Sequence, residues 1–214
     1  MQGNKWLKTM TAVVAICKAA SMIDNIHVTV SFRSTQESAN TMLPYVVLAY
    51  DSKHDKFSKI RNLFPYLLPN GCTPEGLAFS AIMNLFEGIT PDEEDRYFLN
   101  LSDGEPFYHL RVPATGISLS YQDEVGTTHT KAQVDKIRRH GVDILSYFIE
   151  EDYGSKEKDL TPEEEKKKFL LLEKSPLRKN FRKMYGKSSK FINVDEIMGL
   201  AKTLNELFLK KDSV

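Results

Sequence analysis

Hydrophobic and polar positions along the chain predict helices and strands that alternate. Apolar residues first recur every three or four positions, which predicts an amphipathic helix from about residue 5 to residue 23. β-Branched, alternating residues then predict a strand over 25–34. A second strand is predicted over 44–51, and because its residues are almost continuously apolar we expect it to be buried on both faces. A short helix over 57–63 follows.

The next helix has a clear start signal at Thr73-Pro74-Glu75. Threonine is a good N-cap, proline suits the first helical position, and an acidic side chain in the first turn complements the helix dipole. The apolar face predicted for this helix comprises Leu77, Ala78, Ala81, Ile82, Leu85 and Phe86. After an acidic turn at 92–95, an apolar strand is expected over 96–101.

The second half of the chain continues the same alternation. Residues 107–128 are polar and glycine-rich, and we interpret them as a long loop or small insertion. A helix from Thr130 to about His140 and a strand over 142–149 are predicted next. The sequence therefore favours a three-layer, doubly wound α/β domain with a mostly parallel sheet.

The last third combines a polar segment with a closing strand and helix. Residues 153–175 are expected to be a second loop or insertion, in which Thr161-Pro-Glu-Glu164 is a capping-box signature for a short exposed helix. A strand over 189–194 and a helix over 195–209 end the chain. At 214 residues, the whole length suits one domain.

The amino-acid composition excludes several classes of protein. Twenty-nine basic and 29 acidic residues balance, so the chain lacks the basic excess with which proteins bind nucleic acid or anionic membranes. No apolar run approaches the roughly 20 residues that cross a bilayer. The two cysteines, Cys17 and Cys72, are too few for a disulfide framework and favour a reducing compartment, so we expect a cytoplasmic protein.

Two loops that follow predicted elements carry the candidate chemistry. Thr73 precedes a helix, and Asp103 lies in Leu101-Ser-Asp-Gly-Glu-Pro106 at the end of a strand. In a doubly wound sheet such loops fall on the same rim, at the carboxyl ends of the strands. A hydroxyl and a carboxylate are ligands that Mg²⁺, Mn²⁺ or Ca²⁺ accepts. Alone, however, Thr73 is equally well explained as a helix cap and Asp103 as a turn residue.

The order of these motifs resembles the von Willebrand factor A-type domain. Its metal-ion-dependent adhesion site uses a DxSxS motif, then a threonine and an aspartate on two later loops, which Thr73 and Asp103 match. The sequence also resembles the C-terminal A-type domain of the cobaltochelatase CobT subunit, whose strand likewise ends in Ser-Asp-Gly-X-Pro. The segments Asn180-Phe-Arg-Lys-Met and Phe191-Ile-Asn-Val-Asp-Glu-Ile are similar as well.

The chain departs from this family at one point, because it has no DxSxS motif. The resemblance implies that the family's first, central strand is missing, through truncation or because another polypeptide supplies it. Three of the five metal-site side chains would be missing with it. We therefore expect metal binding by Thr73 and Asp103 alone to be weak.

The resemblance implies a non-catalytic, metal-ion-dependent protein-binding module. Thr73 would bind the metal directly and Asp103 through water, and a carboxylate from the partner would complete the coordination shell. The implied partner is an AAA+ ATPase that remodels a client protein. Two alternatives remain open: a hydrolase that uses the metal rim or Cys72, and a structural protein that no longer binds metal.

Other reactive residue types have simpler explanations. Cys72 has no patterned histidine partner, and Cys17 lies on an apolar helix face, so both are expected to pack as small buried residues. His109 and His129 frame the polar loop, but their wide spacing favours surface positions over a zinc site. Four basic residues near the end of the chain are expected to form a solvated face: Arg178, Lys179, Arg182 and Lys183.

Overall fold

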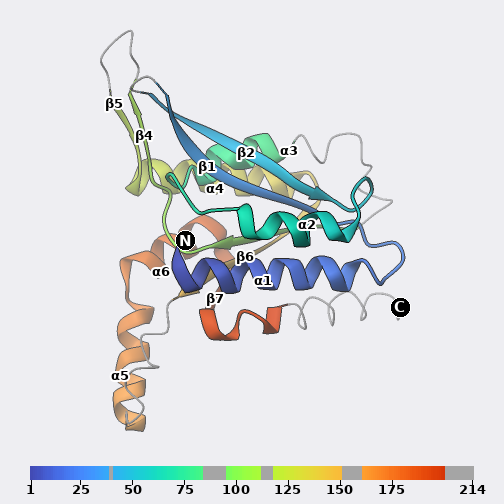
Figure 1. Ribbon diagram of the computed structural model, residues 1–214. Coiled ribbons are helices and arrows are strands. Elements are labelled where there is room, and N and C mark those ends of the chain that lie inside the picture. The colour runs from blue at the N-terminus through green and yellow to red at the C-terminus, as the bar shows by residue number, and fades with distance from the viewer. Residues whose placement is uncertain (39–40, 84–94, 112–117, 151–160, 201–214) are drawn as a thin grey trace.

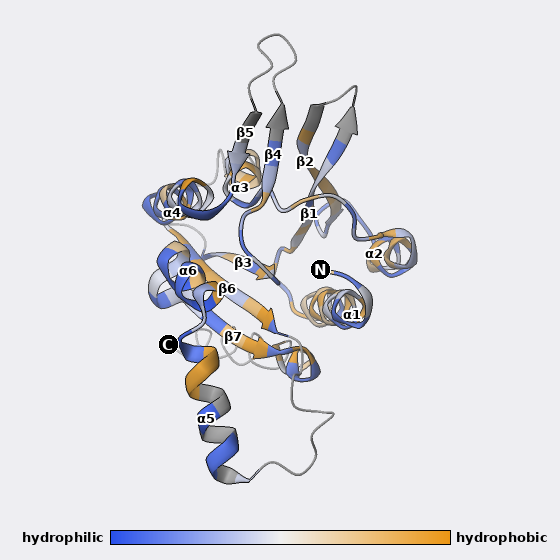
Figure 2. Cartoon of the chain, turned by 90° about the vertical axis from the view of Figure 1, so that its left-hand side faces the viewer, coloured by the Kyte–Doolittle hydropathy of each residue, from blue (hydrophilic) through white to orange (hydrophobic). Residues whose placement is uncertain are grey.

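A computed structural model describes residues 1–38, 41–83, 95–111, 118–150 and 161–200 (Figure 1). Strands form a middle layer, and helices cover it on both sides (Figure 2). The predicted three-layer α/β architecture, with its parallel sheet between helices, is confirmed.

The parallel sheet has three strands in the order β3-β6-β7. They are β3 (Arg96–Ser102), β6 (Val142–Glu150) and β7 (Ser189–Asn193), and all run in the same direction. The sequence predicted each of them to within about one residue. β6 is the central strand of the three, and its apolar side chains contribute to the cores on both faces of the sheet.

The first two strands form a separate antiparallel hairpin, β1 (Thr29–Ser38) with β2 (Thr41–Asp51). The expectation that β2 is buried on both faces is wrong, because Leu43, Val47 and Leu48 are 50%, 41% and 48% exposed. A continuous apolar run is typical of a central parallel strand, but here it lies in a two-stranded antiparallel hairpin, which leaves side chains on both faces of β2 partly exposed.

Helices α1 (Gly3–Ala20) and α2 (Phe57–Leu63) cover one face of the strands, and two short 3₁₀ turns extend this layer. The turns are η1 (Phe64–Tyr66) and η4 (Val194–Glu196). Two buried clusters join this layer to the strands. One consists of Cys17, Ala49, Tyr50 and Ile60, and the other of Ala12, Tyr147, Ile149, Val194, Ile197 and Leu200.

Helices α3 (Glu75–Met83), α4 (Asp123–Arg139) and α6 (Pro176–Tyr185) cover the opposite face, and the 3₁₀ turn η3 (Gly186–Ser188) leads from α6 into β7. They enclose the largest buried cluster, which includes Phe79, Ile82, Val134, Ile137, Val142, Ile144, Phe148, Phe181, Met184 and Tyr185. α3 begins at Glu75, where the Pro74 carbonyl accepts the first helical hydrogen bond, one residue later than the sequence signal indicated.

Close packing between α3 and α4 depends on Gly76. A Cβ atom at this position would lie 2.6 Å from the Tyr121 hydroxyl and 2.8 Å from the Cα of Thr130. Contacts of that length are not tolerated by a side chain, so the absence of one lets the two helices approach. The amino ends of both helices consequently lie beside the loop that follows β3.

Residues 107–128, interpreted as a long loop or small insertion, are not a plain loop where they are described. They contain a small antiparallel hairpin, β4 (Tyr108–Arg111) with β5 (Ser118–Tyr121), and the first turns of α4. α4 begins at Asp123 rather than at Thr130. The early turns of α4 lack apolar periodicity, because their buried positions are Gly126, Thr127 and Thr130; a Cβ on Gly126 would lie 2.9 Å from the Pro106 Cβ.

The expected insertion at 153–175 contains the helix α5 (Pro162–Glu173). The predicted capping box is confirmed: the Glu164 carboxylate accepts from the Thr161 N–H at 2.8 Å, and the Thr161 hydroxyl accepts from the Glu164 N–H. Residues 151–160 lie outside the described residues. So does most of the closing helix predicted over 195–209, although Ile197 and Leu200 are buried as that helix requires.

Among the helices of the described residues, none combines the length and the apolar character that a membrane span needs.

Candidate functional site

The rim at the carboxyl end of β3 brings both sequence-predicted site residues to one place. Thr73 and Phe107 exchange two backbone hydrogen bonds, at 2.9 and 3.0 Å, and Phe107 follows Asp103 by four residues. This bridge ties the loop before α3 to the loop after β3. Thr73 and Asp103 both line a single large groove that opens beside β3. We call these two loops, Asn70–Pro74 and Asp103–Phe107, the rim.

The carboxylate of Asp103 faces positive charge. Its Oδ2 atom lies 2.8 Å from the amino group of Met1 and 4.0 Å from the Lys5 ammonium nitrogen. Both cations come from the start of α1, so the amino end of this helix is held at the rim. The Asp103 side chain is only partly exposed, at 22%, which strengthens these charge interactions relative to a fully solvated pair.

The described residues of the rim do not fit a complete metal site. Thr73 and Asp103 offer two oxygen donors, and the ammonium group of Met1 already engages the carboxylate. Within the described ranges, no three histidine, cysteine, aspartate or glutamate side chains lie together as a metal site would require. Because Mg²⁺ demands six ligands in near-octahedral geometry, two donors leave most of its shell to water.

A fully buried carboxylate, Glu75, lies at the centre of a polar cluster near the rim. It is 0% exposed and accepts hydrogen bonds from Asn100 Nδ2 at 3.0 Å, from Ser102 Oγ at 3.2 Å and from the Tyr185 hydroxyl. Arg33 supplies the balancing charge, with Nη2 3.1 Å from Glu75 Oε2. We call these five residues the Glu75 cluster. It joins α3, β1, β3 and α6 at one point.

Sequence reasoning missed this cluster. Glu75 was explained as a first-turn acid that complements the helix dipole, which needs no burial. Its four partners lie between 25 and 110 residues away in the sequence, so only the fold brings them together. Burial and the nearby Glu75 carboxylate raise the pKa of Tyr185 well above its ordinary value, so this phenol stays protonated and donates. The one available signal was a lone Arg33 in an otherwise apolar and hydroxyl-rich strand.

Arg33 also spans the groove. Its Nη1 atom donates to Asn100 Oδ1 on β3 at 2.9 Å, and its guanidinium lies over the Phe79 ring. Its Nε atom is buried without a hydrogen-bond partner among the described residues. A buried donor without an acceptor lowers the stability of the fold, so a group that accepted a hydrogen bond from this atom would be favourable here.

The histidines are not arranged for nucleophilic catalysis. His27 approaches both Asp51, at 2.7 Å, and the Thr29 hydroxyl, at 3.5 Å, but through the same Nε2 atom. A catalytic triad needs the carboxylate and the nucleophile on opposite ring nitrogens. His129 bonds to the Tyr121 hydroxyl, whose pKa is raised by burial and which is therefore a poor nucleophile.

The two cysteines lie in different surroundings. Cys17 is 1% exposed and its pKa is raised to about 12 by burial, so the expectation of a core residue is confirmed. Cys72 is half-buried in the rim, where its backbone N–H donates to the Thr35 hydroxyl at 2.7 Å. His109 is exposed and packs edge-on against Phe107, which agrees with the expected surface position.

The expected solvated basic face is wrong in one important respect. Arg178 is 6% exposed and pairs with Glu150 and Glu173, and its guanidinium lies 4.6 Å from the centre of the Phe191 ring. Arg182 pairs with Glu173 as well. The acidic partners neutralise the basic residues, so this region holds α6 to the sheet and does not form a basic docking surface.

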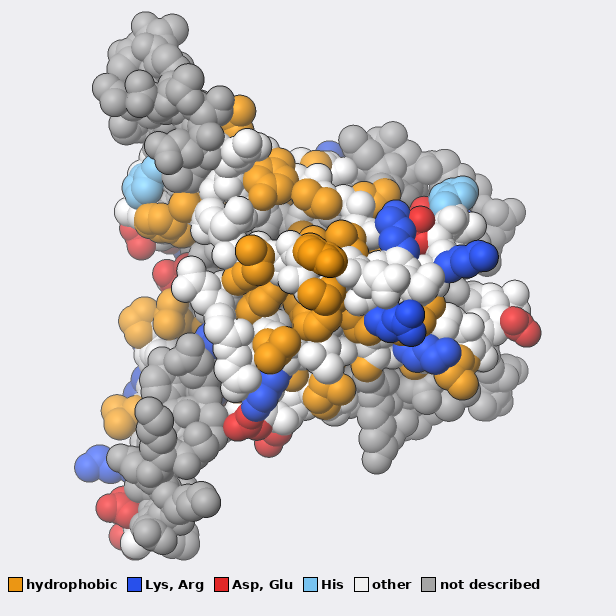
Figure 3. All heavy atoms as spheres, in the orientation of Figure 1, with side chains coloured by type: hydrophobic (Ala, Val, Ile, Leu, Met, Phe, Trp, Pro, Cys, Tyr) orange, Lys and Arg blue, Asp and Glu red, His pale blue; other side chains and the backbone are white. Residues whose placement is uncertain are grey.

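A second surface feature lies on the α1–α2 layer. Hydrophobic side chains gather on the face of the molecule formed by α1 and α2 (Figure 3). Leu7, Tyr66 and Leu68 are 54%, 81% and 74% exposed. This apolar face is a competing candidate for contact with another protein, because contiguous exposed apolar patches commonly mark interaction sites.

No family model matches the sequence, and no curated protein matches it either.

Proposed function

We propose that this chain is a non-catalytic, cytoplasmic protein-binding module that contacts its partner through the rim. The observation that carries the proposal is that Thr73 and Asp103, thirty positions apart, line one groove and that their loops are tied by the Thr73–Phe107 backbone pair. Exposed polar groups positioned on loops by a rigid α/β body are typical of binding sites.

The geometry of His27 favours binding over hydrolysis. Its contacts with Asp51 and Thr29 use the same ring nitrogen and do not fit a triad. A hydrolase would need a nucleophile and base within hydrogen-bond reach of each other.

The resemblance to A-type domains supports an AAA+ ATPase as the partner and a client protein as its substrate. A divalent cation would strengthen the contact only when further oxygen donors join Thr73 and Asp103, because two donors are too few for a dedicated site. Metal dependence would therefore be a property of the complex, and metal binding by the isolated chain would be weak.

Site-specific photo-crosslinking tests the contact surface. Phe107, 44% exposed at the rim, and Tyr66, 81% exposed on the α1–α2 face, are replaced one at a time by benzoylphenylalanine in the full chain, expressed in its native host. We expect an AAA+ ATPase to crosslink at position 107 and not at position 66. Crosslinking of that ATPase at position 66 alone would assign the contact to the apolar face and overturn the proposal.

Calorimetric titration of MgCl₂ into the purified chain tests the metal part. We expect binding no tighter than about 1 mM, the weak end of the range for oxygen-ligand sites. Saturable binding far tighter than that, lost in Asp103→Asn but kept in the Glu105→Gln control, would mean that the rim is a complete metal site.

A further inference from the structure

Helices α1 and α2 carry basic side chains and no acidic ones. Their basic residues are Lys5, Lys8, Lys18, Lys59 and Arg61, and Lys56 directly precedes α2. The whole chain balances 29 basic residues with 29 acidic ones, so these two helices are positively charged relative to the rest of the molecule. A local excess of one charge attracts a partner of the opposite sign.

Three of these cations already have a counter-charge: Lys5 pairs with Asp103, Lys8 with Asp195 and Lys59 with Asp55.

The other three cations are Lys18, Lys56 and Arg61. All are exposed, and none pairs with a carboxylate among the residues that the structure describes. The Lys18 ammonium lies over the Phe57 ring, and Arg61 Nε donates only to the neutral Asn62 side chain, at 3.4 Å. A carboxylate brought beside these three cations would therefore gain attraction that no group of the described chain supplies.

The two helices are antiparallel. At one end, Trp6 Nε1 of α1 donates to the Leu67 carbonyl just beyond α2, at 2.9 Å. At the other end, the Lys18 nitrogen near the end of α1 lies 5.4 Å from the centre of the Phe57 ring, at the start of α2. Side chains of the first turns of α1 therefore lie beside those that follow α2.

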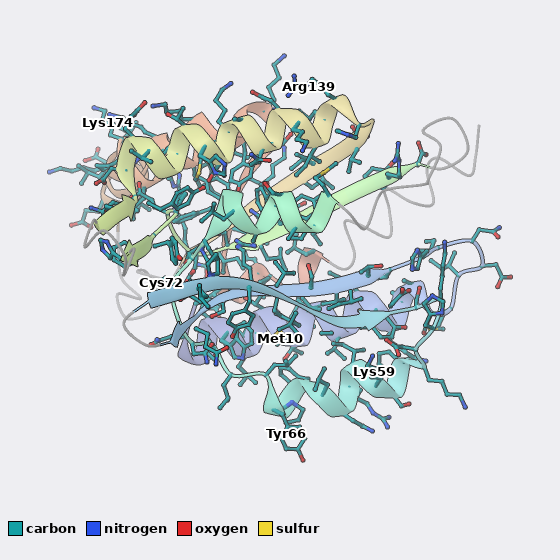
Figure 4. The ribbon with its side chains drawn as sticks, turned by 90° about the horizontal axis from the view of Figure 1, so that it is seen from above. Met10, Lys59, Tyr66, Cys72, Arg139 and Lys174 are labelled. Atoms are coloured by element: carbon teal, nitrogen blue, oxygen red, sulfur yellow. The ribbon has the colours of Figure 1, made fainter. Side chains whose placement is uncertain are left out.

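This arrangement separates apolar from basic side chains along the helices. Leu7, Tyr66 and Leu68 are exposed at one end, and Tyr66 points away from the strands (Figure 4). Lysine and arginine side chains gather toward the other end of the same face (Figure 3). At a rise of about 1.5 Å per residue, Leu7 and Lys18 are roughly 16 Å apart along α1, which is about three helical turns.

We propose that the α1–α2 face binds an acidic, amphipathic helix of a partner protein. Carboxylates in the first turn of that helix would pair with Lys18, Lys56 and Arg61. Leucine or aromatic side chains in its next two turns would pack on Tyr66 and Leu68. Acidic residues in a first turn also complement the helix's own dipole, and an apolar helix face laid on a groove between helices is a common mode of recognition.

The inference goes beyond the proposed rim contact, which leaves Tyr66 free for a second partner, and either proposal can fail alone.

The separation of the two kinds of side chain favours a helix over a membrane surface. An anionic membrane is uniform along its plane, so it favours basic side chains distributed around the apolar ones that it takes up. Here the apolar side chains lie at the end of Leu7 and the unpaired basic ones toward the end of Lys18. A helix with one acidic and one apolar end matches this order, and a lipid surface does not.

A synthetic helix tests the proposal on the full chain. The probe is about three turns long, acetylated and amidated, with glutamates in its first turn and leucines in the next two turns on the same face. Alanine and glutamine fill the other positions, and a lactam staple on the far side keeps it helical, because short isolated helices are marginal. Binding is measured by the anisotropy of a fluorescent label on the probe. We expect saturable binding that weakens about tenfold as salt rises from about 0.01 M to about 0.15 M.

The control helix has the same composition, but its glutamates lie on the face opposite the leucines. It cannot make the charged and the apolar contacts together, so we expect it to bind at least about tenfold more weakly. Equal binding of the two helices would overturn the proposal, as would the failure of both to bind.

Two pairs of variants locate the contact. Arg61→Glu should weaken binding about tenfold, whereas Lys167→Glu, the same change of charge at an exposed position of α5, should leave it unchanged. Tyr66→Ser should weaken binding by a similar factor, and Leu171→Ser, at a 65% exposed position of α5, should not. Circular dichroism establishes that each variant is folded. Equal weakening by the α5 variants would mean non-specific attraction and would overturn the proposal.

Two further measurements address other occupants of the face. Flotation with vesicles of phosphatidylcholine and phosphatidylserine should show no binding that depends on Arg61 or Tyr66. Such binding would assign the face to lipid. Sedimentation equilibrium without the probe should show no self-association that is lost in Tyr66→Ser, since that result would mean that a second copy covers the face. Either of these results would overturn the proposal.

Discussion

Replacement of Glu75 by glutamine is the sharpest test of how the molecule holds the rim. The substitution keeps the shape of the side chain and one carbonyl oxygen for the Tyr185 hydroxyl, but it removes the charge that pairs with Arg33 at 3.1 Å. Arg33 is 17% exposed and would be left without a counter-charge. Removal of one partner from a buried ion pair typically costs 3–5 kcal/mol.

Because Arg33 keeps some contact with solvent and with Asn100, we expect a loss near the lower end, about 3 kcal/mol of unfolding free energy. For a chain of this size, each kcal/mol lowers the melting temperature by about 2–4 °C, so the expected decrease is about 6–12 °C. The assay is urea denaturation followed by circular dichroism, with a thermal melt as the second measurement.

Glu124→Gln is the matched control. Glu124 pairs with Lys183, but its side chain is 77% exposed, and exposed ion pairs contribute about 0–1 kcal/mol. If Glu75→Gln destabilises the chain no more than Glu124→Gln does, the Glu75 cluster is not a stabilising buried ion pair and the reasoning is refuted.

Three further predictions concern other parts of the molecule. Burial raises the pKa of the Cys17 thiol to about 12 in the folded chain, against an ordinary 9.0. The unfolded chain therefore loses this proton first, and the free energy of unfolding should fall as the pH rises above 9. Urea titrations at increasing pH should show this fall for the parent chain and a shallower one for Cys17→Ala. Arg178→Ala, which removes a buried cation that pairs with Glu150 and shares Glu173 with Arg182, should cost about 3 kcal/mol, against about 1 kcal/mol or less for the 40%-exposed Arg182→Ala; equal urea midpoints would contradict this. Thr161→Ala should weaken α5 by about 1 kcal/mol, seen as faster amide exchange in residues 162–173, and unchanged exchange would mean that the capping box is not stabilising.

Periodicity was enough to place most of the elements. Apolar spacing of three and four predicted α1, and short apolar runs bounded by turn residues predicted β3, β6 and β7. The Thr161 capping box was predicted with its register because its two hydrogen bonds are local. These signals succeed because each depends on residues within one or two turns of one another.

The elements that the sequence missed depend on distant contacts. The β4–β5 hairpin has little apolar alternation, and the start of α4 is packed through Gly126 against Pro106 rather than through apolar side chains. Likewise, the partial exposure of β2 on both faces follows from its place in a two-stranded hairpin. A run of apolar residues does not distinguish that place from the centre of a sheet.

For the candidate site, the sequence determined the residue types and the fold determined their neighbours. A strand followed by Ser102-Asp103-Gly104 and a helix opened by Thr73 predicted one rim, but Thr73 follows α2 and η1 rather than a parallel strand, so the two loops are joined by the Thr73–Phe107 backbone pair. The buried position of Glu75, the ion pair between Asp103 and the amino group of Met1, and the groove between β1 and β3 were decided by the tertiary structure alone. Each of these joins residues far apart in the sequence, and the energy of such a pair depends on burial and distance, which local sequence patterns do not encode.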